Sequence, residues 1–313
     1  YSVAVSTSNM FVIKYKNFFI GLSATLVVLA MVAVGVYGLP LGIDFKGGSQ
    51  IQLSYPAARP SIAEVTEAVS LSPMRDAIVQ PTGESGIILK GHFITEAEKD
   101  TVIATLRGSE DTVIKVESFT TIGPSVGAEL KRKAIVSVVL VLIAIILFVA
   151  YAFRKSSQPV SSWKYGLSVI MTLTHDIIIC IGAFALIGHF YGAEVDTLFI
   201  VALLTTLALS ISDTIVVFDR IRENLAIKKE SHGNALFEAT VGDSLSQTFV
   251  RSINTSLMVF VMVLTLAIIG PESTRLFSIM LAIGMFFGTY SSIFLASPLL
   301  VFFERLQKKM VKE

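Results

Sequence analysis

The sequence has little charge and almost no cysteine, and each shortage excludes a class of protein. Only 16% of its 313 residues are charged, against about a quarter in soluble domains. Its 25 basic and 24 acidic residues nearly cancel, which excludes a nucleic-acid binder that works through bulk positive charge. The single cysteine, Cys180, excludes a disulfide framework and a cysteine-based zinc site. The four histidines lack the clustered spacing of a metal site.

Sequence motifs for soluble catalysis are also missing. The chain contains no P-loop, no dinucleotide-binding fingerprint and no catalytic-triad order. We therefore expect neither an enzyme nor a bound cofactor. Any work that the protein performs must draw its energy from a membrane.

Apolar residues dominate the composition. The chain is 53% hydrophobic and its mean hydropathy is +0.72. A helix that crosses a bilayer needs about 20 apolar residues, and six runs are long enough. The first run is too long for a signal-peptide core and lacks a convincing cleavage site, so we expect it to be retained. The sequence thus predicts a polytopic α-helical membrane protein with spans at 18–37, 134–153, 166–189, 197–218, 248–269 and 276–303.

The short loops predict the orientation. Basic residues gather on one side, whereas the loops after the third and fifth spans hold only Arg275. By the positive-inside rule, residues 1–17 and 304–313 are then cytoplasmic. Three basic residues at 131–133 oppose the rule, but they follow a long translocated domain, where the rule is weak. On the cytoplasmic side, residues 219–246 are polar and predict a helix along the membrane surface. The basic residues of this side are Lys14, Lys16, Arg154, Lys155, Lys164, Arg220, Arg222, Lys228, Lys229, Arg305, Lys308, Lys309 and Lys312.

Residues 40–132 form the long polar segment between the first two spans, and this orientation places them outside the cytoplasm. Ser61 and Glu64 have the spacing of a capping box that opens a helix, and Thr95 and Glu98 repeat it. Short apolar or alternating segments around them predict strands. The predicted order is β-α-β-β-α-β, that of a small ferredoxin-like α+β domain. Its strands are expected at 51–55, 77–80, 86–90 and 112–119, and its helices at 61–70 and 95–107.

Ionisable side chains are rare inside the predicted spans, where each costs about 2.5–3.5 kcal/mol at the centre of a helix. They are His175 and Asp176 in the third span, Asp213 in the fourth and Arg251 in the fifth. Each lies on a stripe of polar residues at helical spacing, so three helices offer a polar seam to the interior of the bundle. The stripes contain Ser168, Thr172, Thr206, Ser210, Gln247, Thr248, Asn254 and Thr255.

Depth in the membrane brings two of these groups together. Asp213 lies about 8 Å and Arg251 about 5 Å from the cytoplasmic ends of their spans, so they share a layer and can pair. Asp176 lies about 15 Å deep, near the midplane. A buried acid beside an arginine can be poised to gain and lose a proton, as a proton relay requires. The alternatives are a static ion pair between Asp213 and Arg251, a hydrogen-bonded core histidine at 175, and a supporting role for Asp176.

Two glycine motifs are interpreted as structural. Gly284 and Gly288 form a small-xxx-small seam on the sixth span, which is typical of close helix packing. Residues 42–48, Gly-Ile-Asp-Phe-Lys-Gly-Gly, follow the first span and suit a tight backbone passage, although their spacing fits any turn. Cys180 is expected to be a small packing residue.

Several segments together resemble SecF, the smaller subunit of the SecD–SecF protein translocase, which is related to the RND transporters. The stretch at 212–224, which begins near the end of the fourth span, is highly specific to this family. The resembling segments follow the family's order from the first span to the sixth. The string departs from the family at Ser212, where asparagine is usual, and residues 225–227 carry less charge than is usual. The resembling segments are residues 42–48, the pair His175-Asp176, and residues 212–224, 247–251, 255–257 and 288–298.

The resemblance implies an RND-type bundle in the bacterial inner membrane. It implies a SecD partner, separate or fused upstream of Tyr1, next to the SecYEG channel with SecA and YajC or YidC. The pair would use the proton motive force to complete the translocation of unfolded preproteins, with protons passing at Asp213 and Arg251. The supporting polar residues would be Ser210, Ser212, Thr214, Asn254 and Thr255, and the family motif residues Gly42, Asp44, Gly47, Gly48, Asp219, Arg220 and Arg222.

Two other functions remain open. An RND-like exporter of lipids or small molecules would need two such bundles and larger external domains, whereas this chain predicts one bundle and roughly ninety external residues. A passive scaffold or insertase-like partner would use the buried charges for packing alone. Substrate accumulation in cells tests the first alternative, and pH-dependent conformational change with SecD tests the second.

Overall fold

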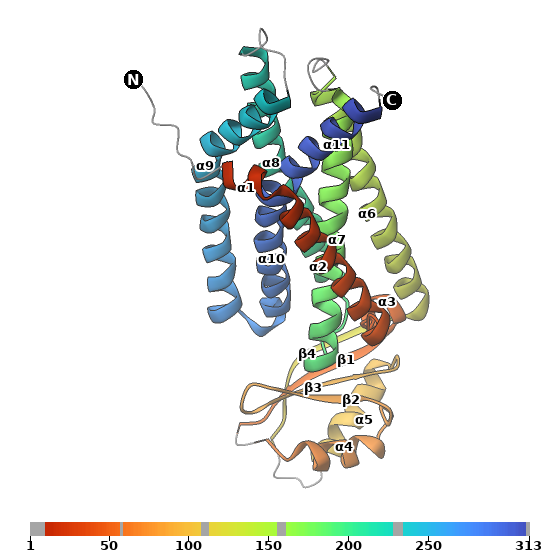
Figure 1. Ribbon diagram of the computed structural model, residues 1–313. Helices are drawn as coiled ribbons and strands as arrows, with labels where there is room; N and C mark the ends of the chain where they lie inside the picture. The colour runs from red at the N-terminus through yellow and green to blue at the C-terminus, as the bar shows by residue number, and fades with distance from the viewer. Residues whose placement is uncertain (1–9, 57–58, 108–112, 155–160, 228–233, 311–313) are drawn as a thin grey trace. The chain divides into compact units, whose positions relative to one another are not determined.

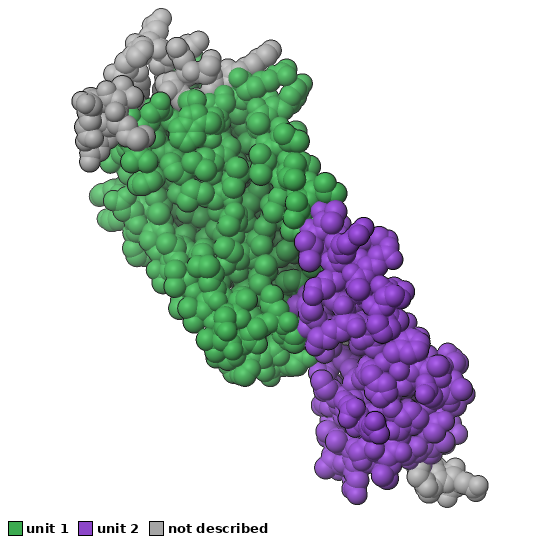
Figure 2. All heavy atoms as spheres, turned by 90° about the vertical axis from the view of Figure 1, so that its right-hand side faces the viewer, with its two compact units in different colours: residues 1–40, 138–193, 198–313 green, residues 41–137, 194–197 purple. Residues whose placement is uncertain are grey.

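The computed structural model describes residues 10–56, 59–107, 113–154, 161–227 and 234–310 (Figure 1). The chain divides into two compact units, which Figure 2 shows in different colours. The helical unit comprises residues 1–40, 138–193 and 198–313, and the α+β unit comprises residues 41–137 and 194–197. The first nine residues and four of the basic residues used to predict the orientation, Lys155, Lys228, Lys229 and Lys312, lie outside the described residues.

Six helices in the described part of the chain are long and apolar enough to cross a membrane, which confirms the predicted six-helix bundle. A short helix, α1, precedes the first of them, and the sixth is interrupted by a π-helical turn, η1. The elements are α1 (Met10–Lys14), α2 (Lys16–Tyr37), α6 (Pro124–Ala152), α7 (Ser162–Tyr191), α8 (Thr197–Ile227), α9 (Asn234–Ile269), α10 (Glu272–Ser291), η1 (Ser292–Ala296) and α11 (Ser297–Met310).

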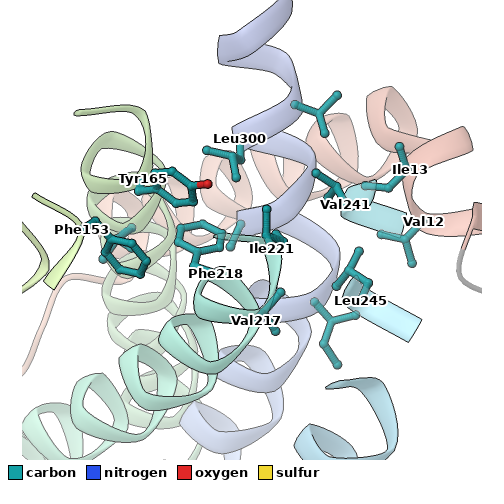
Figure 3. Packing of buried hydrophobic residues seen from close by; sticks show 14 of the residues in the cluster. Val12, Ile13, Phe153, Tyr165, Val217, Phe218, Ile221, Val241, Leu245 and Leu300 are labelled. Atoms are coloured by element: carbon teal, nitrogen blue, oxygen red, sulfur yellow. The ribbon is translucent and has the colours of Figure 1, made fainter. Parts of the chain in front are cut away.

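Helices α8 and α9 run well beyond the apolar stretches that predicted them. The sequence predicts a surface helix over 219–246; in the structure residues 219–227 continue α8 and residues 234–246 belong to α9. The cause is packing. Ile221 on α8 and Val241 and Leu245 on α9 are buried in one hydrophobic core (Figure 3). Burial of these apolar side chains keeps both helices regular past the point where hydropathy alone would end them.

Aromatic rings fill another part of the same core. Phe153 stacks on Tyr165 of α7 with ring centroids 5.0 Å apart, and Tyr165 meets the edge of Phe218 on α8 at 5.3 Å. All three side chains are buried (Figure 3). Such contacts stabilise beyond their buried area, so they fix α7 and α8 side by side at this end of the bundle.

The α+β unit contains a four-stranded antiparallel sheet with strand order β2-β3-β1-β4. The β-α-β-β-α-β order is the one that the sequence predicted. Two helices lie on one side of the sheet (Figure 1), and the inward residues Ile51, Leu53, Ile87 and Leu89 are fully buried. The elements are α3 (Ile43–Lys46), β1 (Gly48–Ser54), α4 (Ile62–Ser70), β2 (Ile78–Thr82), β3 (Gly86–Gly91), α5 (Glu96–Arg107) and β4 (Lys115–Ile122).

Both capping boxes predicted from the sequence are confirmed. The Ser61 N–H donates to Glu64 at 2.9 Å, and the Glu64 N–H donates back to the Ser61 hydroxyl at 3.3 Å. The same reciprocal bonds join Thr95 and Glu98, at 2.7 and 3.4 Å. These bonds satisfy backbone N–H groups that have no partner inside the helix, and so they set where α4 and α5 begin.

Candidate functional site

Asp176 is the centre of a polar cluster inside the helical unit. Its side chain is fully buried, and three side chains contact it. Ser210 of α8 and Ser291 of α10 both donate to Oδ2, at 2.5 and 2.9 Å. His175 Nδ1 lies 2.9 Å from Oδ1. One carboxylate therefore joins three helices, and the lipid-free interior supplies the hydrogen bonds that a buried acid requires.

The glycine seam of α10 brings these groups within reach. A Cβ at Gly284 would lie 2.9 Å from the Cβ of Thr206, and one at Gly288 would lie 3.1 Å from the Cβ of Ser210. Glycine at both positions thus allows α10 and α8 to approach closely, as the small-xxx-small pattern predicted. Ser291 lies one helical turn beyond Gly288 and is placed against Asp176 by this packing.

The cluster continues into the π-helical turn. The Ser292 hydroxyl lies 3.0 Å from the Thr214 hydroxyl and donates to the Ser210 carbonyl at 3.1 Å. This turn ends two residues before Pro298, which has no N–H to donate to the helix. Interrupted helices of this kind are frequent at functional sites. In the same region, His175 Nε2 is buried and is one of the polar atoms without a hydrogen-bond partner among the described residues.

Asp213 and Arg251 lie on neighbouring helices, as predicted, but among the described residues they are not joined by an ion pair. The half-buried Asp213 carboxylate instead accepts a hydrogen bond from Ser256 of α9 at 2.8 Å. The charge of Arg251 is near enough to act on that carboxylate. Asp213 is therefore held by one neutral hydroxyl and influenced, without direct contact, by a guanidinium group.

A polar stripe beside Asp213 points away from the core. Ser212 on α8 and Arg251, Asn254 and Thr255 on α9 are all exposed. We call these four residues the exposed polar stripe. Lipid tails offer no hydrogen bonds, so polar groups at membrane depth are normally covered by protein or by a water-filled cavity. Within the stripe, the Thr255 hydroxyl already donates to the Arg251 carbonyl at 2.9 Å, so the groups that a partner would cover are the side chains of Ser212, Arg251 and Asn254.

The family-motif residues of α8 bind its neighbours. Arg220 Nε donates to Gln247 of α9 at 2.5 Å, and Asn224 donates to the same side chain at 3.0 Å. Arg222 pairs with Asp219 at 2.5 Å and donates to the carbonyl of the last α6 residue at 3.3 Å. The contacts with Gln247 and with the α6 carbonyl tie α8 to α9 and α6.

The remaining predicted site residues are placed as follows. Ser168, Thr172, Thr206 and Thr248 are buried, and Cys180 is a buried free thiol, in keeping with its expected packing role. Gly42, Asp44, Gly47 and Gly48 belong to the α+β unit. The described residues contain no group of three histidine, cysteine or acidic side chains that could hold a metal ion.

Two contact residues were not predicted as partners of the carboxylates. Ser256 binds Asp213, and Ser291 binds Asp176. A signal existed for the second, because Ser291 follows the glycine seam at helical spacing and so lies on the packed face of its helix. For Ser256 no comparable signal existed, because the sequence predicted several polar residues on α9 as equally good candidates to contact Asp213.

Comparison with known proteins identifies the family. Residues 101–306 match the family described as "Protein export membrane protein SecD/SecF, C-terminal", and residues 32–55 match the "SecD/SecF GG Motif". A protein translocase subunit SecF from Anaerolinea thermophila is 34% identical over 291 residues, covering 92% of each chain. The corresponding subunit from Thermobaculum terrenum is 36% identical over 310 residues, covering 94% of this chain and 93% of the relative. This chain belongs to the SecF family.

Solved structures agree with the SecF assignment. SecDF from Thermus thermophilus, described as a translocon-associated membrane protein, superposes with a TM-score of 0.80 at 28% identity. A SecDF in a form called super-membrane-facing gives a TM-score of 0.67 at 28% identity. Each match covers more than nine-tenths of this chain, but the chain spans only 38% and 39% of the two SecDF chains. The SecF-like portion of those proteins is thus joined to a larger remainder.

Proposed function

We propose that this SecF-family chain acts with a SecD partner and uses the proton motive force to complete preprotein translocation through the SecYEG channel. Both termini would lie in the cytoplasm and the α+β unit on the opposite side of the bacterial inner membrane. The observation that carries the proposal is the state of Asp213. Its carboxylate lies in a membrane-spanning helix and is bonded to a neutral serine rather than to the nearby arginine. Such a carboxylate can bind or release a proton without first breaking an ion pair.

The exposed polar stripe supports a second bundle as partner. Lipid cannot satisfy the side chains of Arg251 and Asn254, so a protein surface that covers them would lower the cost of keeping them in the membrane. In the SecDF structures the portion similar to this chain is accompanied by a larger remainder. We propose that a SecD bundle packs against this stripe and closes the surroundings of Asp213.

The second polar cluster is included in the proposal as a further proton-binding site. Asp176 and His175 are in hydrogen-bond contact, and the second ring nitrogen of His175 is buried. A histidine whose Nδ1 meets a carboxylate can hold a proton on either group. The dense hydrogen bonding around Asp176 favours a slower exchange there than at Asp213.

The test compares Asp213→Asn with the unaltered chain in inverted membrane vesicles that contain SecD and SecYEG. Asparagine keeps the size of the side chain but cannot carry a proton, so gradient-driven completion of translocation should disappear while the complex with SecD stays intact. Asp76→Asn, at an exposed acid of the α+β unit, is the control and should change nothing. If Asp213→Asn completes translocation as the unaltered chain does, the result favours the hypothesis of a passive scaffold.

Asp176→Asn separates the two clusters in the same assay. If gradient-driven completion is lost with an intact complex, Asp176 belongs to the proton path. If completion survives, the Asp176 cluster holds α7, α8 and α10 together and protons pass at Asp213 without it.

A further inference from the structure

Two buried polar contacts join α7 to the last membrane-spanning segment of the helical unit. At one end, Lys164 of α7 pairs with Glu304 of α11, and both side chains are almost fully buried. About three helical turns further along α7, Asp176 accepts a hydrogen bond from Ser291 of α10. Between these contacts α7 packs against η1 and α11. We call the interface between the two contacts the α7 seam; all of it lies within the helical unit.

The α7 seam contains two serine side chains that the mechanism has not yet used. Ser168 lies four residues after Lys164, so the two share a face of α7. Ser297 lies seven residues before Glu304, which is two turns along the same face of α11. Both serines are 0% exposed. Each helix therefore presents a buried hydroxyl to the seam between its two ends.

These hydroxyls require a partner that the protein does not supply. Among the residues that the structure describes, the side-chain oxygens of Ser168 and Ser297 lack a hydrogen-bond partner, and so does Nε2 of His175, which contacts Asp176. Buried hydroxyls in proteins are nearly always hydrogen-bonded, either to protein or to ordered water. Lipid offers neither donors nor acceptors. Water bound in the α7 seam would satisfy both serines.

The polar groups of the seam are spaced closely enough for water to link them. One bridging water spans about 5.5 Å between two oxygen atoms, and a buried water needs two to four polar partners. Along the helix axes, no two successive polar groups are more than about 6 Å apart. The Thr172 hydroxyl donates to the Ser168 carbonyl at 2.8 Å and can still accept. Measured from the Lys164–Glu304 pair, the heights are about 6 Å for Ser168, 10 Å for Ser297, 12 Å for Thr172 and 18 Å for Asp176.

We infer that water molecules bind in the α7 seam and give Asp176 a proton route to the Lys164–Glu304 pair. Water and hydroxyl groups both donate and accept, so each oxygen in the row can accept one proton and release another. No helix has to move for this transfer. The pair lies on α11, the last helix of the described chain, so in the proposed orientation the route ends on the cytoplasmic side. The inference rests on the proposed function, because it gives the Asp176 site its path.

Thiol exchange in heavy water tests for the bound water directly. The purified full chain carries Cys180→Ala and one new cysteine, and the decay of its S–H infrared band in heavy water is followed in lipid vesicles. A thiol in contact with water exchanges its proton, whereas one in a dry core must wait for the fold to open. Ser168→Cys and Ser297→Cys should therefore exchange at least about tenfold faster than Val169→Cys. Val169 is 1% exposed, lies in the apolar core and matches Ser168 in depth.

Translocation in inverted vesicles with SecD and SecYEG tests the role of the seam. The double variant Ser168→Ala, Ser297→Ala removes both hydroxyls and should slow gradient-driven completion about fivefold, the factor that corresponds to one ordinary hydrogen bond. The gradient-independent phase should not change. Ser278→Ala removes an equally buried hydroxyl on α10, on the far side of Ser291, and should keep the full rate.

A matched pair of variants serves if the double alanine variant accumulates poorly. Threonine and valine have nearly the same shape and differ by the hydroxyl, so Ser297→Thr and Ser297→Val bear the same steric cost. Gradient-driven completion should be faster in Ser297→Thr than in Ser297→Val. Equal rates in the two variants would show that the hydroxyl has no part in the step.

The two assays separate failure of the inference from failure of the proposed function. If Ser168→Cys and Ser297→Cys exchange as slowly as Val169→Cys, the seam is dry and the inference is wrong, whereas the proposed function stands. If the double alanine variant keeps the full rate while Asp176→Asn loses it, protons reach Asp176 by another path. If Asp213→Asn keeps the full rate, the proposed function fails, and the proton route fails with it even where thiol exchange is fast.

Discussion

Removing the positive charge of Lys164 should destabilise the helical bundle far more than removing that of an exposed lysine. Lys164 of α7 pairs with Glu304 of α11, and the two side chains are only 2% and 6% exposed. Loss of one partner of a buried ion pair typically costs about 3–5 kcal/mol, because the other charge stays buried. Lys164→Met keeps an unbranched side chain that fills most of the space, so the cost should come mainly from the lost charge.

The chain offers a matched control for this change. Lys133 and Glu129 form an i,i+4 pair on α6 whose side chains are 68% and 60% exposed. Such pairs contribute roughly 0.5 kcal/mol or less, so Lys133→Met should have almost no effect. Adding Glu304→Leu to Lys164→Met removes the buried charge as well, and should recover most of the lost stability.

Cys180 provides the assay. It is the single cysteine in the sequence and its side chain is buried, so a thiol-reactive dye should label it only when the bundle opens. At about 2–4 °C per kcal/mol, Lys164→Met should lower the midpoint temperature of labelling in detergent by roughly 6–20 °C. The reasoning is refuted if Lys164→Met and Lys133→Met are labelled at the same temperature, or if the double variant is no more stable than Lys164→Met alone.

Two further predictions use single substitutions. Gly284→Ala places a Cβ 2.6 Å from Cγ2 and 2.9 Å from Cβ of Thr206, so it should cost about 1–3 kcal/mol in the same labelling assay. Gly166→Ala meets no atom within 4 Å and should be neutral or stabilise by up to about 1 kcal/mol; the opposite order would contradict the packing. Hydrogen bonds from the Thr95 backbone and hydroxyl hold the pKa of Glu98 below its ordinary value. The Glu98 carboxylate therefore stabilises α5 fully above the unfolded-state pKa. This stabilisation is lost as the pH falls through the lower folded-state pKa. Amide exchange in the first turn of α5, corrected for intrinsic rates, should therefore rise on acidification, whereas Glu98→Gln should exchange faster at neutral pH and show no such rise.

Local patterns in the sequence predicted the elements whose stabilising contacts are local. The two capping boxes depend on residues three positions apart, and both formed as expected. The six membrane-spanning helices follow from the length of each apolar run. The alternating pattern of β1, with Ile51 and Leu53 inward and Gln52 outward, follows from the two-residue period of a strand.

Contacts between helices could not be predicted in the same way. Helical periodicity placed Thr172 and Asp176 on one face, but it could not show that Ser291 of α10 would meet that face. Depth placed Asp213 and Arg251 in one layer, whereas the rotation of α9 turns Ser256 toward the carboxylate instead. Hydropathy likewise ended α8 and α9 at the membrane surface, because it does not register burial against other helices.

Asp213 and Arg251 could form an ion pair only if one of them moved, and α8 is poorly placed to move. Asp213 is three positions after Ser210, so their side chains point roughly 60° apart and lie about 4.5 Å apart along the axis. On one side Ser210 donates to Asp176, and on the other Asp213 accepts from Ser256. Sliding or rotating α8 toward Arg251 would therefore break the bond to a fully buried carboxylate.

Packing adds a second restraint on α8. Gly284 leaves no room between α10 and Thr206 of α8, and a close-packed contact of this kind resists small displacements. Arg251, by contrast, is exposed and has a long side chain with several rotatable bonds. The gap to Asp213 is therefore closed at least cost by the Arg251 side chain itself.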